Sequence, residues 1–112
     1  MLFRSIAVVD GSGNLIAHAT MDGTQHGSIA IAQGKARTAA LYRRPTKIFE
    51  DRANSGAPSV LSLLALTGGA ASEGGFPIVV DGKLIGAIGA SGGLSSQDAV
   101  AAKAGMEAAG GK

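Results

Sequence analysis

Two short turn segments, each set between a pair of apolar runs, constrain the fold of this chain more than any other feature. The letters GSGN connect Ser5–Asp10 to Leu15–Thr20, and DGK connects Phe76–Val80 to Leu84–Ala90. Turns rich in Gly, Asn and Asp join antiparallel neighbours because these residues accept positive φ angles. The sequence therefore predicts two β-hairpins, one toward each end of the chain.

Helical patterns occupy the region between the hairpins. The longest runs over Ser28–Arg44, with alanines at helical spacing, and ends before Pro45 because proline disfavours helical geometry in the residue before it. A shorter helix, Lys47–Asn54, follows with Thr46 as its expected cap. Ser59–Leu66 fits either a buried helical turn or a strand, since so short an apolar run has no distinctive period.

A final alanine-rich helix is predicted over residues 95–109, where Ser95 followed by Asp98 resembles a capping box. Two hairpins separated by helices indicate an α+β fold, with an antiparallel sheet of four to five strands flanked by helices. A chain of 112 residues without a linker or internal repeat is a single domain, residues 1–112.

The composition limits the partners and the location that we expect. Eighteen glycines and many alanines give a core that buries little area for each residue, so a homo-oligomer is expected. A net charge of +2, without aromatic residues among the basic ones, argues against nucleic acid as a partner. No apolar run approaches the ~20 residues of a membrane helix and no signal peptide is evident, so we expect a bacterial cytoplasmic protein without a membrane partner.

Six of the ten Lys and Arg residues lie between Lys35 and Arg52, which makes this segment the first candidate for ligand binding. Arginine presents a planar fork that suits a carboxylate, and a helix start at Thr46 would add backbone N–H groups. The alternative is a solvated helix face whose charges pair with Glu50 and Asp51. Cysteine is absent, which excludes disulfides, thiolate metal sites and cysteine nucleophiles.

Two further patterns raise the possibility of catalysis or metal binding. Gly89–Gly93 matches G-x-S-x-G between a strand and a helix, so Ser91 is a candidate nucleophile, with His26 and Asp22 as candidate partners. A tight strand-to-helix turn rich in glycine produces the same pattern without catalysis, and the full sheet of an α/β-hydrolase does not fit in 112 residues. His26, and after it His18, are candidate iron or metal ligands, although no HxH or HExxH spacing supports them.

Several ordered pieces carry a resemblance to a known family. They are IAVVDGSGNLIA from Ile6, Met21-Asp22-Gly23, KARTAALYRRPT from Lys35, and GGFPIVVDGKLIGAIGASGG from Gly74, followed by Gln97-Asp98 and AAKAG. Together they cover nearly the whole chain, which resembles the GlcG/HbpS family, also found as the C-terminal domain of PduO-type proteins.

The resemblance implies an antiparallel sheet flanked by helices, oligomeric assembly and, in some members, haem as a ligand. It favours Thr38, Arg44 and Thr46, together with Lys35, as ligand-binding residues. Relatives usually carry a helix before the first strand, and the fold expected for this chain lacks that helix. A neighbouring subunit would then cover the exposed sheet surface, or the chain is a shortened form.

The sequence leaves three functions open. The leading prediction is a non-catalytic protein that binds haem or another small anionic molecule beside the segment Lys35–Lys47. The alternative is a small enzyme of the same fold acting on an ester or carboxylate, with a hydrolase mechanism through Ser91 as the first guess. A purely structural or assembly role is the third.

Overall fold

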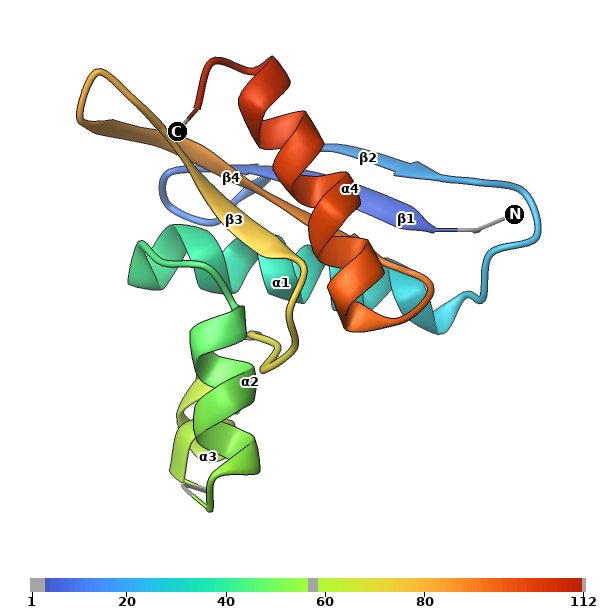
Figure 1. The fold of residues 1–112 in the computed structure, drawn as a ribbon, viewed down its shortest axis with the longest axis vertical. Coiled ribbons are helices and arrows are strands. Elements are labelled where there is room, and N and C mark those ends of the chain that lie inside the picture. The colour runs from blue at the N-terminus through green and yellow to red at the C-terminus, as the bar shows by residue number, and fades with distance from the viewer. Residues whose placement is uncertain (1–3, 57–58, 112) are drawn as a thin grey trace.

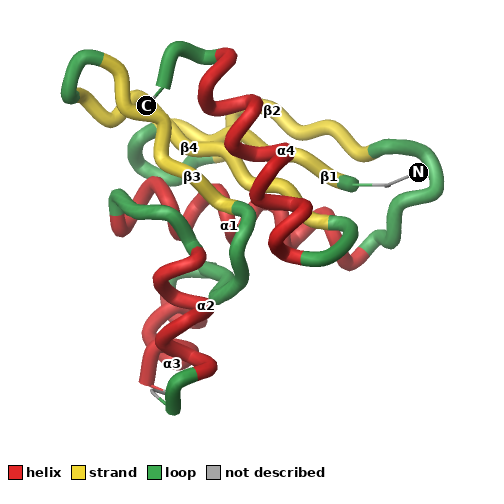
Figure 2. The backbone as a smooth tube through the Cα atoms, in the orientation of Figure 1, coloured by secondary structure: helices red, strands yellow, loops and turns green. Residues whose placement is uncertain are grey.

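Two β-hairpins join edge to edge into one four-stranded antiparallel sheet with the order β2-β1-β4-β3. The first hairpin consists of β1 (Ser5–Asp10) and β2 (Leu15–Thr20), and the second of β3 (Gly75–Val80) and β4 (Lys83–Ser91). The computed structural model describes residues 4–56 and 59–111 (Figures 1 and 2). The predicted hairpins and the α+β fold class are confirmed.

Four helices complete the domain. They are α1 (Gly27–Tyr42), α2 (Lys47–Asn54), α3 (Ser59–Leu66) and α4 (Ser95–Ala108). The segment that fitted either a helix or a strand is therefore helical. In the part of the chain that the structure describes, no helix combines the length and apolarity needed to cross a membrane.

The long helix α1 lies very close to one face of the sheet because both surfaces are built from small side chains. Its alanines pack on the inward residues of β1 and β4 in a cluster of Ala7, Val9, Ala32, Ala36, Ala39, Ala40 and Ala87. Alternate residues of a strand point to opposite faces, which is why Ala7 and Val9 share this side. A Cβ added at Gly89 would lie 2.6 Å from the backbone nitrogen of Ala36, so only glycine permits this approach.

The last helix, α4, covers the opposite face of the sheet (Figure 1). Larger side chains fill this second core: Ile78 and Ile88 from the strands pack with Ala102 and Met106 from α4. Strand β2 lies at the sheet edge beyond both helices, and all six of its residues are exposed.

Helices α2 and α3 form an arm that extends away from the sheet and α1 (Figure 1). The arm has a small core, in which Phe49 and Leu64 are buried. The ring of Phe49 also contacts that of Tyr42, at the end of α1, with centroids 5.4 Å apart. Three leucines of α3 remain exposed: Leu61, Leu63 and Leu66.

The predicted cap of α2 is confirmed in its position, whereas the predicted capping box of α4 is wrong. Thr46 occupies the N-cap position of α2 without a side-chain capping bond, because its hydroxyl accepts a hydrogen bond from the N–H of Gly75 instead. The N-cap residue of α4 is Leu94, which makes no side-chain capping bond, so Ser95 and Asp98 do not form the expected capping box. The carboxylate of Asp98 has a different partner, described below. Both side chains are used in tertiary contacts, which local sequence patterns do not reveal.

Candidate functional site

The basic segment Lys35–Lys47 does not form one surface, because the turn of α1 sends its side chains in different directions. Lys35 and Thr38 point into the protein and are 1% and 0% exposed. Arg37 lies along the side of the helix, half-buried. Arg44 follows the end of α1 and is exposed. The predicted ligand-binding residues therefore have separate surroundings.

Lys35 forms a buried ion pair. Its Nζ donates to Asp98 Oδ2 at 3.2 Å and to the carbonyl oxygen of Ala90 at 2.9 Å. The other carboxylate oxygen, Asp98 Oδ1, accepts from the N–H of Gly93 at 3.3 Å. Burial lowers the pKa of Lys35, and the charge of Asp98 opposes that shift. The pair thus joins α1 to the end of β4 and the start of α4.

The two threonine candidates also have internal partners. The Thr38 hydroxyl donates to the carbonyl of Gly34 at 2.7 Å and accepts from the N–H of Ala70 at 2.9 Å. Thr46 is likewise fully buried and holds the N–H of Gly75 at 2.9 Å. Both hydroxyls fix the loop that leads from α3 into β3.

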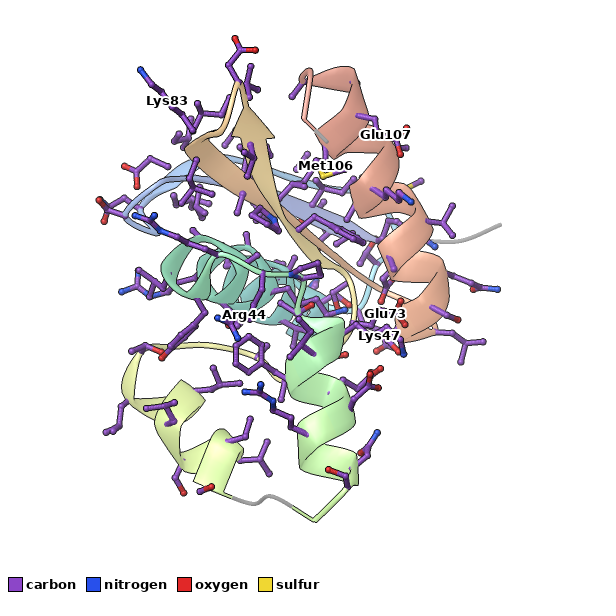
Figure 3. The ribbon with its side chains drawn as sticks, turned by 60° about the vertical axis from the view of Figure 1, so that its left-hand side comes forward. Arg44, Lys47, Glu73, Lys83, Met106 and Glu107 are labelled. Carbon is purple, nitrogen blue, oxygen red and sulfur yellow. The ribbon has the colours of Figure 1, made fainter. Side chains whose placement is uncertain are left out.

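Arg44 and Lys47 lie at the junction of the arm with the rest of the domain, where Glu73 comes close to Lys47 (Figure 3). The Nε of Arg44 donates to the carbonyl of Tyr42 at 3.0 Å. Lys47 forms an exposed ion pair with Asp51 at 3.3 Å, one helical turn later. Of the four predicted ligand-binding residues, Arg44 is the one whose side chain faces solvent.

A cavity of about 300 Å³ opens on the side of α1 that faces the first hairpin; we call it the α1 cavity. Three polar side chains line it: Asn14, Gln33 and Arg37. Arg37 is held in place by two backbone carbonyls, since its Nε donates to Thr67 and its Nη1 donates to Gly13 at 3.0 Å. Within residues 4–56 and 59–111, no carboxylate forms an ion pair with Arg37. Its positive charge is therefore not paired with a carboxylate in this part of the chain.

The residues of the alternative hydrolase mechanism are not assembled into a triad. Ser91 is buried at the end of β4, whereas His26 and Asp22 are exposed in the segment before α1. Among the described residues, no hydrogen bond joins any two of the three. A serine nucleophile needs a base within hydrogen-bond reach, and the structure shows no such contact. Ser91 instead precedes a tight turn through Gly92, as the plainer interpretation of the motif predicted.

Neither histidine belongs to a metal-binding cluster in the described part of the chain, where no three His, Cys, Asp or Glu residues come together. His18 lies on the exposed edge strand, and its Nε2 is 3.1 Å from the hydroxyl of Thr20. His26 is at the N-cap position of α1 and makes no side-chain capping bond. The proposal of His26 as a metal ligand stays a prediction.

Sequence reasoning did not identify the α1 cavity or the partner of Lys35. The cavity-lining residues of α1 are Ala30, Gln33, Gly34 and Arg37, which have the spacing of one helical face. That spacing is visible in the sequence, but it indicates a cavity only once the first hairpin is known to lie opposite. Asp98 is far from Lys35 in the chain, and no local pattern links the two.

A buried helix against an antiparallel sheet, with a polar cavity along its side, defines a small α+β domain able to hold a ligand. The chain belongs to the HbpS-like family, described as "Haem degrading protein HbpS-like", which matches residues 4–107. The resemblance inferred from the sequence is thereby confirmed.

Relatives and solved structures agree with this assignment. Protein GlcG of Escherichia coli K12 is 48% identical over 87 residues, which cover 78% of this chain and 63% of the length of GlcG. The PduOC:haem complex has a TM-score of 0.86 at 28% identity, covering 96% of this chain and 78% of that one. The HbpS double mutant of Streptomyces reticuli has a TM-score of 0.84 at 30% identity, covering 96% and 71%.

Proposed function

We propose that this protein binds haem or another small anionic ligand beside the segment Lys35–Lys47, with Arg37 as the anion-binding residue. Membership of the HbpS-like family and similarity to the PduOC:haem complex support a ligand of this class. The observation that carries the proposal is the un-neutralised guanidinium of Arg37 in the wall of the α1 cavity.

Arg37 suits this role for geometric reasons. Two of its five N–H groups are engaged by the carbonyls of Thr67 and Gly13, which fix the plane of the guanidinium without cancelling its charge. A guanidinium already held in place loses little side-chain entropy when it binds a carboxylate, and charge-assisted bonds of this kind are strong. A carboxylate, including a propionate of haem, is the group that this arrangement favours.

Titration with haemin tests the haem part of the proposal. We expect a shift of the Soret band on binding and an affinity about tenfold or more lower for Arg37→Gln, because the charge-assisted bonds are lost. Arg52→Gln is the matched control, since it removes an exposed arginine from α2 with the same change of charge. An absence of any Soret shift, or equal affinities for the two variants, would contradict the assignment of Arg37.

We propose in addition that the protein is a homo-oligomer. The core beside α1 consists largely of alanines, which bury little area, while α3 leaves apolar surface exposed. Leu66 is 84% exposed and Leu61 is 53% exposed, on a helix without a charged residue. Light scattering at micromolar concentration tests association, and a strictly monomeric mass would count against it.

A further inference from the structure

The walls of the α1 cavity come from three separate parts of the chain. One face of α1 supplies Ala30, Gln33 and Arg37, and the turn of the first hairpin supplies Asn14 and Leu15. Gly68, in the loop after α3, is the third part, and Val9, Gly13 and Gly34 complete the lining. Ala30 is exposed, and its short side chain keeps the cavity open on the helix side.

The polar groups of the cavity are not equivalent. Arg37 offers positive charge and N–H donors. Asn14 Nδ2 donates to Asp10 Oδ2 at 3.3 Å, which leaves the amide oxygen Oδ1 of Asn14 as an acceptor. The amide of Gln33 is one helical turn before Arg37 on the same face and can donate or accept. A complementary ligand therefore has an anionic group and, a short distance from it, an N–H or O–H donor.

The volume limits the size of that ligand. At about 30 Å³ for each water-sized group, 300 Å³ holds about ten non-hydrogen atoms. This lies at the lower end of the range for small-molecule sites. A porphyrin ring has more than twice that number of non-hydrogen atoms, so only a peripheral carboxylate of such a ring would enter.

We propose that the α1 cavity is a binding site for a small carboxylate that also carries an N–H or O–H donor. The inference rests on the proposed function in taking Arg37 as the anion-binding residue, and it goes further in naming the size and the second polar group. Arg37 binds the carboxylate and Asn14 Oδ1 accepts from the donor. Haem, where bound, has its ring outside this cavity.

The test uses N-acetylglycine as the probe, because it has a carboxylate and an amide N–H within the size limit. We expect saturable shifts of the backbone amide signals of Gly13, Gly34 and Gly68 in ¹H–¹⁵N spectra of the whole chain, with a dissociation constant on the order of 1 mM. The neutral analogue N-acetylglycinamide is expected to bind about tenfold more weakly, as it cannot form the charge-assisted bonds.

Two variants make the assignment specific. Ala30→Phe fills the cavity from an exposed position, and Arg37→Gln removes the charge; each is expected to weaken N-acetylglycine binding about tenfold or more. Ala104→Phe, at an exposed position of α4, and Arg52→Gln are the controls and should bind as the wild type does. Retained α-helical circular dichroism shows that a variant is folded.

The outcomes separate this inference from the haem proposal. Binding of N-acetylglycine that Ala30→Phe abolishes, with or without haemin binding, supports the small-carboxylate site. Haemin binding that Ala30→Phe leaves unchanged supports a ring outside the cavity. Equal affinities for the acid and the neutral amide, shifts confined to other parts of the chain, or unchanged binding in Ala30→Phe would each overturn the inference, even if haemin binds.

Discussion

Removal of the Asp98 carboxylate is expected to destabilise the fold several times more than removal of the Asp51 carboxylate. Both carboxylates accept from a lysine at nearly the same distance, 3.2 Å in Lys35–Asp98 and 3.3 Å in Lys47–Asp51. They differ in burial: both side chains of the first pair are 2% exposed, against 55% and 61% in the second. The comparison therefore isolates the effect of burial on an ion pair.

The magnitude follows from the cost of an unpaired buried charge. At 3.2 Å and an effective dielectric constant of about 20, opposite charges attract by about 5 kcal/mol, a gain that the desolvation of both groups offsets. Deleting one partner leaves the other desolvated without compensation, and costs about 3–5 kcal/mol. After Asp98→Ala, Lys35 Nζ keeps its hydrogen bond to the carbonyl of Ala90 but has lost its carboxylate partner. For the exposed pair, solvent screens both charges, so Asp51→Ala should have a much smaller effect.

Urea denaturation followed by circular dichroism, at one protein concentration, measures both costs. With a denaturant slope of about 1–2 kcal/mol per molar urea, Asp98→Ala should lower the midpoint by about 2 M or more and Asp51→Ala by less than about 1 M. Asp98→Asn is a milder variant that keeps an acceptor for Gly93, should Asp98→Ala fail to fold. The double variant Lys35→Met/Asp98→Ala should lose less stability than the two single losses combined.

The result that refutes this reasoning is an Asp98→Ala midpoint no lower than that of Asp51→Ala. Equal midpoints would mean that water reaches the Lys35 ammonium and screens it, contrary to its position beneath the turn that follows β4. Additive losses in the double variant would show that the two charges do not stabilise each other.

Gly89→Ala is expected to cost about 3 kcal/mol or more, because its Cβ would strike the backbone of α1. Gly27→Ala is the control and should be nearly neutral, since its Cβ would have nothing within 4 Å. Thermal melts compare the two variants, and equal melting temperatures would contradict the close packing. Replacing Leu63 and Leu66 together by Gln is expected to lower the oligomer mass in light scattering, since both lie exposed on α3; an unchanged mass would place the interface elsewhere. Because burial lowers the pKa of Lys35, the unfolded chain holds that proton more tightly at pH values between the folded and unfolded pKa values. Stability relative to Lys35→Met should therefore rise with pH across that range. Urea titrations at successive pH values measure it: a difference that falls with pH would show the opposite sign, and a flat one would show that burial does not shift the pKa of Lys35.

The fold could be predicted from the sequence because its determinants are local. Each hairpin is specified by its own turn, and α1 by its alanine spacing and by Pro45. The pattern of Ser59–Leu66 fits either structure because so short an apolar run has no distinctive period. In the fold the segment is a helix, with Leu64 buried while its neighbours remain exposed. The predicted side-chain caps are absent for a non-local reason: Thr46 and Asp98 form hydrogen bonds with residues distant in the chain.

The candidate site was predictable only in outline. The concentration of basic residues points to α1, the helix that lines the α1 cavity, but a charge count cannot tell a buried lysine from one in solvent. Thr38 and Thr46 were named through the family resemblance, and the structure places both hydroxyls against backbone groups of the loop before β3. Whether either also contacts a ligand stays a prediction.

The rotation of α1 explains why one basic segment holds groups with opposite roles. Lys35 and Arg37 are two positions apart and therefore about 200° apart around the helix axis, so they face different surroundings. Lys35 meets a carboxylate, and its charge is cancelled within the fold. Arg37 meets two neutral carbonyls, which orient its guanidinium but leave its charge in place beside a cavity. An anion would find no unpaired charge at Lys35, whereas at Arg37 it would find a charged group already held in place. We therefore propose Arg37, and not the buried Lys35, as the anion-binding residue of the segment.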